Sequence, residues 1–199
     1  EKAKQVGIAL AKLNQIPAPD YLPNKHTYVD TTYPEVMSQD MDINYKFWVA
    51  QRYRYCIDNL PLQLPVGLVH GDIFFDNVLF EDDDFKAILD FEDASRIYKI
   101  FDLGMAAAGI CTEGPNLDLN KVRALAAGYQ EIRLLEDIEK NSLQLCIEWA
   151  AILTSTWRFW KYNIDMPDAN KSDKYLQMVS IAVNSRAFPK EAFKRAVFS

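Results

Sequence analysis

Apolar residues recur at helical spacing along most of the chain. In residues 2–16, Val6, Leu10 and Leu13 share one face with Ala9 and Ile16, which predicts an amphipathic helix. The same periodicity predicts further helices over residues 48–60, 100–108, 119–130, 134–164 and 174–183. These patterns predict a mainly helical protein.

Two polar stretches are expected to interrupt the helices. Asn141-Ser142 lies inside the longest helical pattern and is expected to divide it into two packed helices. Residues 17–34 are polar and contain several prolines, which predicts a long connection. The lone His26 within this connection is assigned no role.

Two short runs follow a strand pattern instead. Residues 78–80 and 85–89 are rich in branched and aromatic side chains. The acidic residues 81–84 lie between them and form a plausible turn, because Asp tolerates turn geometry and is disfavoured inside strands. We therefore predict a β-hairpin with an acidic turn.

This hairpin would gather three oxygen-bearing side chains. Asn77 precedes its first strand, Asp90 closes its second, and Asp72 lies on the loop just before it. Two carboxylates and an amide oxygen suit Mg²⁺, which takes one or two carboxylates and leaves its other positions to water and phosphates. Each residue alone is more often a turn former, but order, spacing and strand context match this chemistry together.

The sequence around these residues resembles a known superfamily. HGDIFFDNVLF begins at His70 and LDFEDA at Leu89, which gives Asp, four residues, Asn, and then a second Asp at a strand end, as in kinase catalytic loops. This pattern resembles the aminoglycoside phosphotransferase and choline kinase-like superfamily, and within it most of all the homoserine kinase (type II) family. The likeness extends to residues 10–14, 18–20, 101–104 and 157–162.

The resemblance implies an α+β, mainly helical fold: the C-terminal lobe of a protein-kinase-like enzyme, with a small catalytic hairpin. ATP and Mg²⁺ are the implied cofactors, and a small-molecule hydroxyl is the implied phosphate acceptor. Asp72 would accept or orient the acceptor proton, while Asn77 and Asp90 would hold Mg²⁺ against the phosphates.

Other residues receive supporting or acceptor-binding roles. His70 is expected to brace the loop by hydrogen bonding, and Asp102 to support it from behind while capping the helix that starts at residue 100. Glu92 and Asp93 are candidates for a substrate ammonium group, although a solvated or capping pair is an equally open interpretation.

A substrate carboxylate would need a cation on the same cleft. Arg158, with Lys161 as its neighbour, interleaves with an aromatic stripe. In the resembling fold this helix lines the acceptor cleft, so Arg158 is the candidate for the carboxylate. Most of the aromatic residues themselves are expected to be core.

Composition and charge narrow the class of protein and its partners further. The 199 residues suit one domain, with 49% hydrophobic and 25% charged residues. A net charge of −6 without a basic block argues against nucleic acid or an anionic membrane as the main partner. No apolar run approaches a membrane span. Cys56, Cys111 and Cys146 are expected to be reduced core residues of a cytoplasmic protein rather than a disulfide frame or zinc site.

Part of the kinase machinery cannot be found in the sequence. A Gly-rich phosphate loop and a strand lysine paired with a helix glutamate are both required. Gly104 and Gly109 have P-loop spacing, but Ile110-Cys111 follows them. We expect residues 1–199 to form one catalytic and acceptor-binding lobe, with the N-terminal nucleotide lobe absent. Such a lobe should fold but be almost inactive alone.

The acceptor is open at this stage. Homoserine is favoured, and an amino sugar, choline or ethanolamine, or a methylthioribose-like sugar is the alternative. A non-catalytic relative that binds a nucleotide or metabolite is a different class of hypothesis. The presence of Asp72, Asn77 and Asp90 together argues against it.

Overall fold

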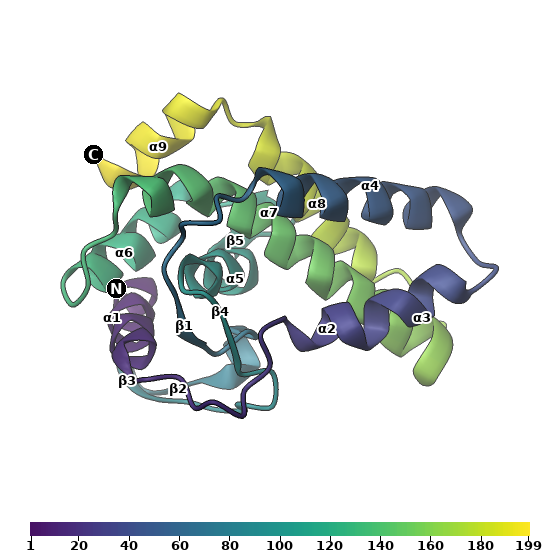
Figure 1. The fold of residues 1–199 in the computed structure, drawn as a ribbon, viewed down its shortest axis with the longest axis horizontal. Coiled ribbons are helices and arrows are strands. Elements are labelled where there is room, and N and C mark those ends of the chain that lie inside the picture. Colours follow the sequence, from purple (N-terminus) through teal and green to yellow (C-terminus); the bar gives the residue numbers. More distant parts are fainter.

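The computed structural model describes the backbone of residues 1–199 and every side chain except that of Asp30. Helices make up most of the chain, and the strands between them are short (Figure 1). The helices are α1 (Lys2–Gln15), α2 (Thr27–Asp30), α3 (Thr32–Ser38), α4 (Ile43–Asn59), α5 (Ile100–Ile110), α6 (Leu119–Gln130), α7 (Asp137–Trp160), α8 (Tyr175–Ala187) and α9 (Lys190–Phe198).

Three antiparallel strand pairs complete the fold. They are β1 (Val66–Val69) with β4 (Ser95–Tyr98), β2 (Val78–Glu81) with β3 (Asp84–Ile88), and β5 (Thr112–Glu113) with β6 (Asn116–Leu117). A 3₁₀ turn, η1 (Phe75–Asn77), leads into β2, and a π-helical turn, η2 (Lys161–Asp165), continues α7. The expected mainly helical α+β fold is confirmed.

Helix α5 is the centre of the molecule (Figure 1). Every one of its residues is buried, as expected for a helix that is apolar on all sides. Helix α7 packs closely against it at Gly104, where a Cβ would lie 2.7 Å from the backbone carbonyl carbon of Cys146. The N-terminal half of α5 is thereby held rigidly behind the loop that follows β1.

Helices α1 and α6 pack side by side through two glycines. A Cβ on Gly7 would lie 2.0 Å from the carbonyl oxygen of Leu125, and one on Gly128 would lie 2.0 Å from that of Lys4. Neither position could carry a side chain without moving the helices apart. Their close approach allows polar groups on the two helices to meet inside the core.

The predicted acidic hairpin is present. Strand β2 pairs with β3 from Val78 opposite Ile88 to Glu81 opposite Asp84. Asp82 takes the left-handed conformation in the turn, with φ 54°. The Leu89 amide also donates to the Asn77 carbonyl over 2.9 Å. Asn77 and Asp90 therefore meet at the open end of the hairpin, as the sequence predicts.

The prediction of a break in the long helix is wrong. Helix α7 is continuous from Asp137 to Trp160. Ser142 stays helical because its hydroxyl donates to the Ile138 carbonyl one turn earlier, over 2.8 Å. Asn141 is exposed, so its amide can be solvated without disturbing the helix.

Other element boundaries also differ from the predictions. The connection expected over residues 17–34 contains α2 and the start of α3. Helix α4 begins at Ile43, five residues before its predicted start, because the Asp42 side chain caps it by accepting from the Tyr45 amide over 3.0 Å. Helix α6 has the predicted bounds.

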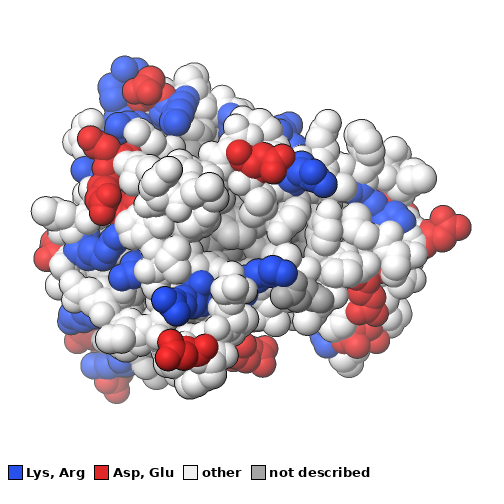
Figure 2. All heavy atoms as spheres, viewed as in Figure 1, with Lys and Arg blue, Asp and Glu red and all other residues white. Residues whose placement is uncertain are grey.

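The cysteines are in the core, and charged side chains are spread over the surface. Cys56, Cys111 and Cys146 are all buried and free. None of the described helices combines the length and apolar character needed to cross a bilayer. On the face shown in Figure 2, acidic and basic side chains are intermixed around a largely uncharged middle.

Candidate active site

The loop after β1 is fixed from behind by Asp102 of α5. Its Oδ2 accepts from the His70 amide over 2.9 Å, and its Oδ1 accepts from the Gly71 amide over 3.0 Å. Burial raises the pKa of Asp102, and these bonds oppose the shift. Asp102 lies in the first turn of α5, where Lys99 is the N-cap. The prediction that it caps its own helix is therefore wrong, because its carboxylate accepts from the loop amides instead.

His70 is fully buried and bonded at both ring nitrogens. Its Nε2 lies 2.9 Å from the Leu89 carbonyl and so donates to it. Its Nδ1 then accepts from the Asp72 amide over 3.2 Å. One ring thus links the loop to the end of the hairpin, next to Asp90.

A second histidine holds the same loop. His26 is 1% exposed, and its Nε2 lies 2.9 Å from the carbonyl oxygen of Gly71. Gly71 has a φ of 90°, which favours glycine, and a Cβ there would lie 2.7 Å from the Asp93 carbonyl oxygen. The interpretation of His26 as incidental is wrong, because His26 bonds directly to the loop.

Asp72 and Asn77 are hydrogen-bonded to each other. The Asn77 Nδ2 donates to the Asp72 carbonyl over 2.8 Å and to its Oδ2 over 2.9 Å. Burial raises the pKa of Asp72 to about 7, assisted by the charges of Asp93, Asp76 and Asp90 and opposed by the Asn77 hydrogen bond. Asp72 is thus a half-buried carboxyl that lines a pocket.

Asp90 has an unusual backbone. Its φ is 60°, a conformation that Asp tolerates better than most residues. Its Oδ1 lies 3.4 Å from the Glu92 amide, which closes a short turn after β3. The carboxylate is exposed and lines the same pocket as Asp72 and Asn77.

The residues present fit a magnesium ion of the kind that completes its coordination with water and phosphate. Among the described residues, no group of three or more His, Cys, Asp or Glu is placed to hold a metal ion. Mg²⁺ needs only one or two carboxylates from protein. The Asn77 amide nitrogen donates both of its bonds to Asp72, which leaves Oδ1 as the atom that could bind a metal ion, and Asn77 lines the same pocket as Asp90.

The three residues open into a pocket of about 610 Å³. Asp72, Asp76, Asn77, Asp90 and Glu92 supply its acidic and amide side. Arg158, Lys171 and Lys174 supply cations, and the remaining lining is largely aromatic: Tyr28, Phe74, Phe75, Trp157 and Tyr162. Opposite charges and aromatic faces in one pocket suit a small polar organic cation or zwitterion.

A larger hollow of about 930 Å³ lies between α4, α7 and α8. Polar groups there satisfy one another: Arg52 binds Glu148 through two bonds of 2.7 and 3.0 Å, and Gln144 donates to the Ser185 and Phe188 carbonyls. The smaller pocket is the candidate active site because it contains a carboxyl with a strongly shifted pKa and ligands for a metal ion.

Of the two predicted cations, the structure brings only Arg158 to the pocket. Its Nη1 donates to Gln177 Oε1 over 2.9 Å, and its guanidinium lies over Phe74, 5.6 Å from the ring centre. Burial lowers the pKa of Arg158. Lys161 instead pairs with Asp165 over 2.7 Å and does not line the pocket.

Glu92 and Asp93 are placed differently. Glu92 is exposed and lines the pocket. Asp93 is 5% exposed and receives a hydrogen bond from the Tyr28 hydroxyl. Burial and the charges of Asp72 and Asp93 raise the pKa of Tyr28. Of the two predicted ammonium ligands, Glu92 is the one the structure brings to the pocket.

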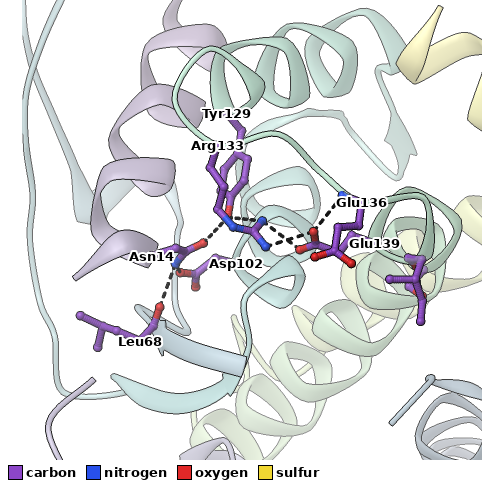
Figure 3. Close-up of polar contacts among 9 residues, drawn as sticks. Asn14, Leu68, Asp102, Tyr129, Arg133, Glu136 and Glu139 are labelled. Atoms are coloured by element: carbon purple, nitrogen blue, oxygen red, sulfur yellow. Dashed lines mark hydrogen bonds and ion pairs between the residues drawn. The ribbon is translucent and has the colours of Figure 1, made fainter. Parts of the chain in front are cut away.

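Asn14 is a site residue that the sequence interpretation missed. From α1 its Nδ2 donates to Asp102 Oδ2 over 2.8 Å and to the Leu68 carbonyl over 2.9 Å (Figure 3). It continues the buried stripe of Val6 and Leu10 at four-residue spacing. The sequence did contain a signal for this role, because Asn14 is a polar residue on an otherwise apolar face of the helix.

Comparison with known proteins agrees with this geometry. Residues 2–135 match the phosphotransferase enzyme family. The homoserine kinase of Bartonella henselae is 36% identical over 96 residues, covering 48% of this chain and 30% of that protein. The homoserine kinase of Rhodospirillum rubrum is 31% identical over 138 residues, covering 69% of this chain and 40% of that protein.

Solved structures share the fold at low identity. A choline/ethanolamine kinase family protein from Mesorhizobium loti superposes with a TM-score of 0.69 and 17% identity, over 98% of this chain and 66% of that one. A microcompartment-associated aminopropanol kinase gives a TM-score of 0.68 and 15% identity, over 98% and 64%. The chain spans about a third of the length of its curated relatives, and its family match covers most of its own residues. The chain belongs to the phosphotransferase enzyme family.

Proposed function

We propose that this chain is the catalytic and acceptor-binding lobe of a kinase that transfers the γ-phosphoryl group of ATP to the hydroxyl of a small molecule. The observation that carries the proposal is the shared pocket of Asp72, Asn77, Asp90 and Arg158. The nucleotide lobe, with its phosphate loop and lysine, would come from a preceding segment. These 199 residues alone are therefore expected to turn over almost no ATP.

The roles follow from position. Asp72 would accept the acceptor's proton as the acceptor oxygen bonds to the γ-phosphorus and the bond to ADP breaks. A pKa near 7 suits such a base. Asn77 Oδ1 and the Asp90 carboxylate would hold Mg²⁺, which supplies charge neutralisation on the phosphates. Such catalysis is mostly positioning and electrostatic stabilisation, which is why His70 and Asp102 matter as supports.

Homoserine is the acceptor we favour. It carries an ammonium and a carboxylate besides its hydroxyl. Glu92 offers an anion and Arg158 a planar cation on the same pocket, and a guanidinium binds a carboxylate bidentately. Two relatives at 36% and 31% identity are named homoserine kinase.

A choline- or ethanolamine-type acceptor is the second candidate. Tyr28, Trp157 and Tyr162 line the pocket, and aromatic faces attract organic cations. Such an acceptor has no carboxylate, so it would leave Arg158 without a substrate partner.

An acceptor panel tests the proposal. The whole protein, including its nucleotide lobe, would be given Mg·ATP with homoserine, choline, ethanolamine or an amino sugar, and the products would be identified by ³¹P NMR. We expect O-phosphohomoserine to form with the highest kcat/KM. Preference for choline would replace the acceptor and keep the chemistry, whereas no phosphate transfer to any small hydroxyl would contradict the proposed function.

A further inference from the structure

A line of buried hydrogen bonds reaches Asp102 from across the core (Figure 3). Arg133 binds Glu139 through two bonds of 2.9 and 3.0 Å. Its Nη1 also donates to the Tyr129 hydroxyl over 3.2 Å, and this hydroxyl donates to Asn14 Oδ1 over 2.8 Å. Asn14 Nδ2 then donates to Asp102 over 2.8 Å. The line runs from the start of α7 through α6 and α1 to α5.

Each bond in the line has a fixed direction. Arg133 can only donate, so the Tyr129 hydroxyl accepts from it and turns its own proton toward Asn14. That proton fixes the Asn14 amide, whose oxygen faces Tyr129 and whose nitrogen faces Asp102 and the Leu68 carbonyl. The two acceptors, Asp102 and the Leu68 carbonyl, hold the nitrogen end of this amide, and the Tyr129 hydroxyl holds its oxygen end. Loss of the hydroxyl would leave the oxygen end without a partner and free the amide that holds Asp102 to shift.

Except for the half-buried Arg133, the line lies in the core. Asn14, Asp102, Tyr129 and Glu139 are each 0% exposed. Polar groups in such a place are costly unless fully paired, and apolar side chains of similar size would often stabilise a fold equally well. At one end the line reaches the Glu136 amide through Glu139, and at the other it reaches the amides of His70 and Gly71 through Asp102, directly before Asp72.

We propose that Asn14, Tyr129 and Arg133 are positioning residues of the phosphotransfer site, acting on the His70–Asp72 backbone through Asp102. The inference rests on the proposed kinase activity. Asn14 sets the orientation of the Asp102 carboxylate, Tyr129 sets that of Asn14, and Arg133 sets that of the Tyr129 hydroxyl. Influence on turnover should decrease in that order.

Tyr129→Phe in the whole protein is the main test, because it removes the hydroxyl and keeps the ring. We expect kcat to fall roughly three- to tenfold, the scale of one hydrogen bond, with the KM values for acceptor and Mg·ATP changed less than twofold. The matched control is Tyr45→Phe, which removes another buried hydroxyl, 3.0 Å from Ser155 Oγ. Its kcat should stay within twofold of the wild type.

Arg133→Met separates positioning from plain stability. It leaves the fully buried Glu139 without its ion-pair partner, so it should lower the melting temperature more than Tyr129→Phe does. It keeps the bond from Tyr129 to Asn14, so it should lower kcat less. The proposal is wrong if Arg133→Met, the less stable variant, loses more kcat than Tyr129→Phe. It is also wrong if Tyr129→Phe and Tyr45→Phe lose kcat equally.

Amide hydrogen exchange gives a readout that needs no substrate. The His70 and Gly71 amides should exchange faster in Tyr129→Phe than in Tyr45→Phe, relative to the core amides of α5. Should Tyr129→Phe fail to fold, Asn14→Ser, which removes the amide bonded to Asp102, is compared with Tyr45→Phe instead, and equal exchange would overturn the proposal. If the wild type phosphorylates no acceptor, the kinase proposal fails while the exchange result still tests the line.

Discussion

The two walls of the candidate pocket are held in different ways. One wall, which we call the phosphate-transfer wall, consists of Asp72, Asn77 and Asp90. There the His70 and Gly71 amides donate to the fully buried Asp102 carboxylate, and Asp72 is hydrogen-bonded to Asn77. The other wall, which we call the acceptor wall, consists of Glu92, Arg158, Lys171 and Lys174. Glu92, Lys171 and Lys174 are exposed. Arg158 there is bonded to a neighbouring side chain, Gln177, rather than to the core.

The difference indicates how one fold can serve several acceptors. Groups that act on the phosphate must keep one geometry, and a saturated buried network provides it. The groups that we propose to recognise the acceptor lie on the turn after β3, on α7 and on the segment between α7 and α8, and most of them are exposed.

The largest effect is expected on the phosphate-transfer wall. Asp72→Asn should reduce kcat by about 10² or more in the whole protein, the scale of a lost general base. Asp58→Asn, which changes an exposed carboxylate on α4, is the matched control and should leave kcat unaltered. Steady-state kinetics of the two variants make the comparison, and wild-type turnover in Asp72→Asn would show that the loop has been misassigned.

An intermediate effect is expected on the acceptor wall. Arg158→Leu should lower kcat/KM for homoserine by roughly 10- to 150-fold, equivalent to losing a charge-assisted contact of about 1.5–3 kcal/mol. An analogue with a neutral group in place of the carboxylate should lose far less.

Lys161→Leu is the matched control for Arg158, because Lys161 pairs with Asp165 outside the pocket. Its kcat/KM for homoserine should remain near the wild-type value. Equal losses with homoserine and the neutral analogue in Arg158→Leu would make Arg158 a structural residue.

The smallest effect concerns stability and pH. Burial lowers the pKa of His26, while the hydrogen bond to Gly71 and the charge of Asp93 oppose the shift. Below the unfolded pKa near 6.5, the unfolded chain binds a proton that the native chain does not. The free energy of unfolding should therefore fall with decreasing pH, by up to about 1.4 kcal/mol per pH unit.

His26→Gln should weaken this dependence, because the titrating ring is gone while one hydrogen-bonding group remains. Urea unfolding between pH 5 and 8 measures it, and both proteins keep His70. The same pH slope in the two proteins would show that His26 does not cause it.

Local sequence was enough to predict the phosphate-transfer wall. Asp72, Asn77 and Asp90 lie within one loop and one hairpin, so their spacing along the chain fixes their meeting in space. The branched and aromatic runs at 78–80 and 85–89, with the acidic turn between them, identified that hairpin without any long-range information.

Residues that reach the site from distant elements could not be predicted in the same way. Local sequence alone made Asp102 look like a helix cap, because its partners lie 31 and 32 residues away; its support of the loop was predicted only from the family resemblance. His26 had no periodic pattern around it, and Asn14 interrupts an apolar face of α1 that α6, β1 and α5 cover in the folded protein. Tertiary contacts decide each of these roles.

Metal binding tests the assignment of the pocket most directly. Mn²⁺ can replace Mg²⁺ as a spectroscopic probe, and its binding with ATP to the whole protein can be followed by EPR. We expect Asp90→Asn to weaken Mn·ATP binding by about tenfold or more, because a charged ligand worth at least about 1.4 kcal/mol is lost, while Asp72→Asn stays within twofold of the wild type. Unchanged binding in Asp90→Asn, or equal weakening in both variants, would contradict the assignment of the metal to Asn77 and Asp90.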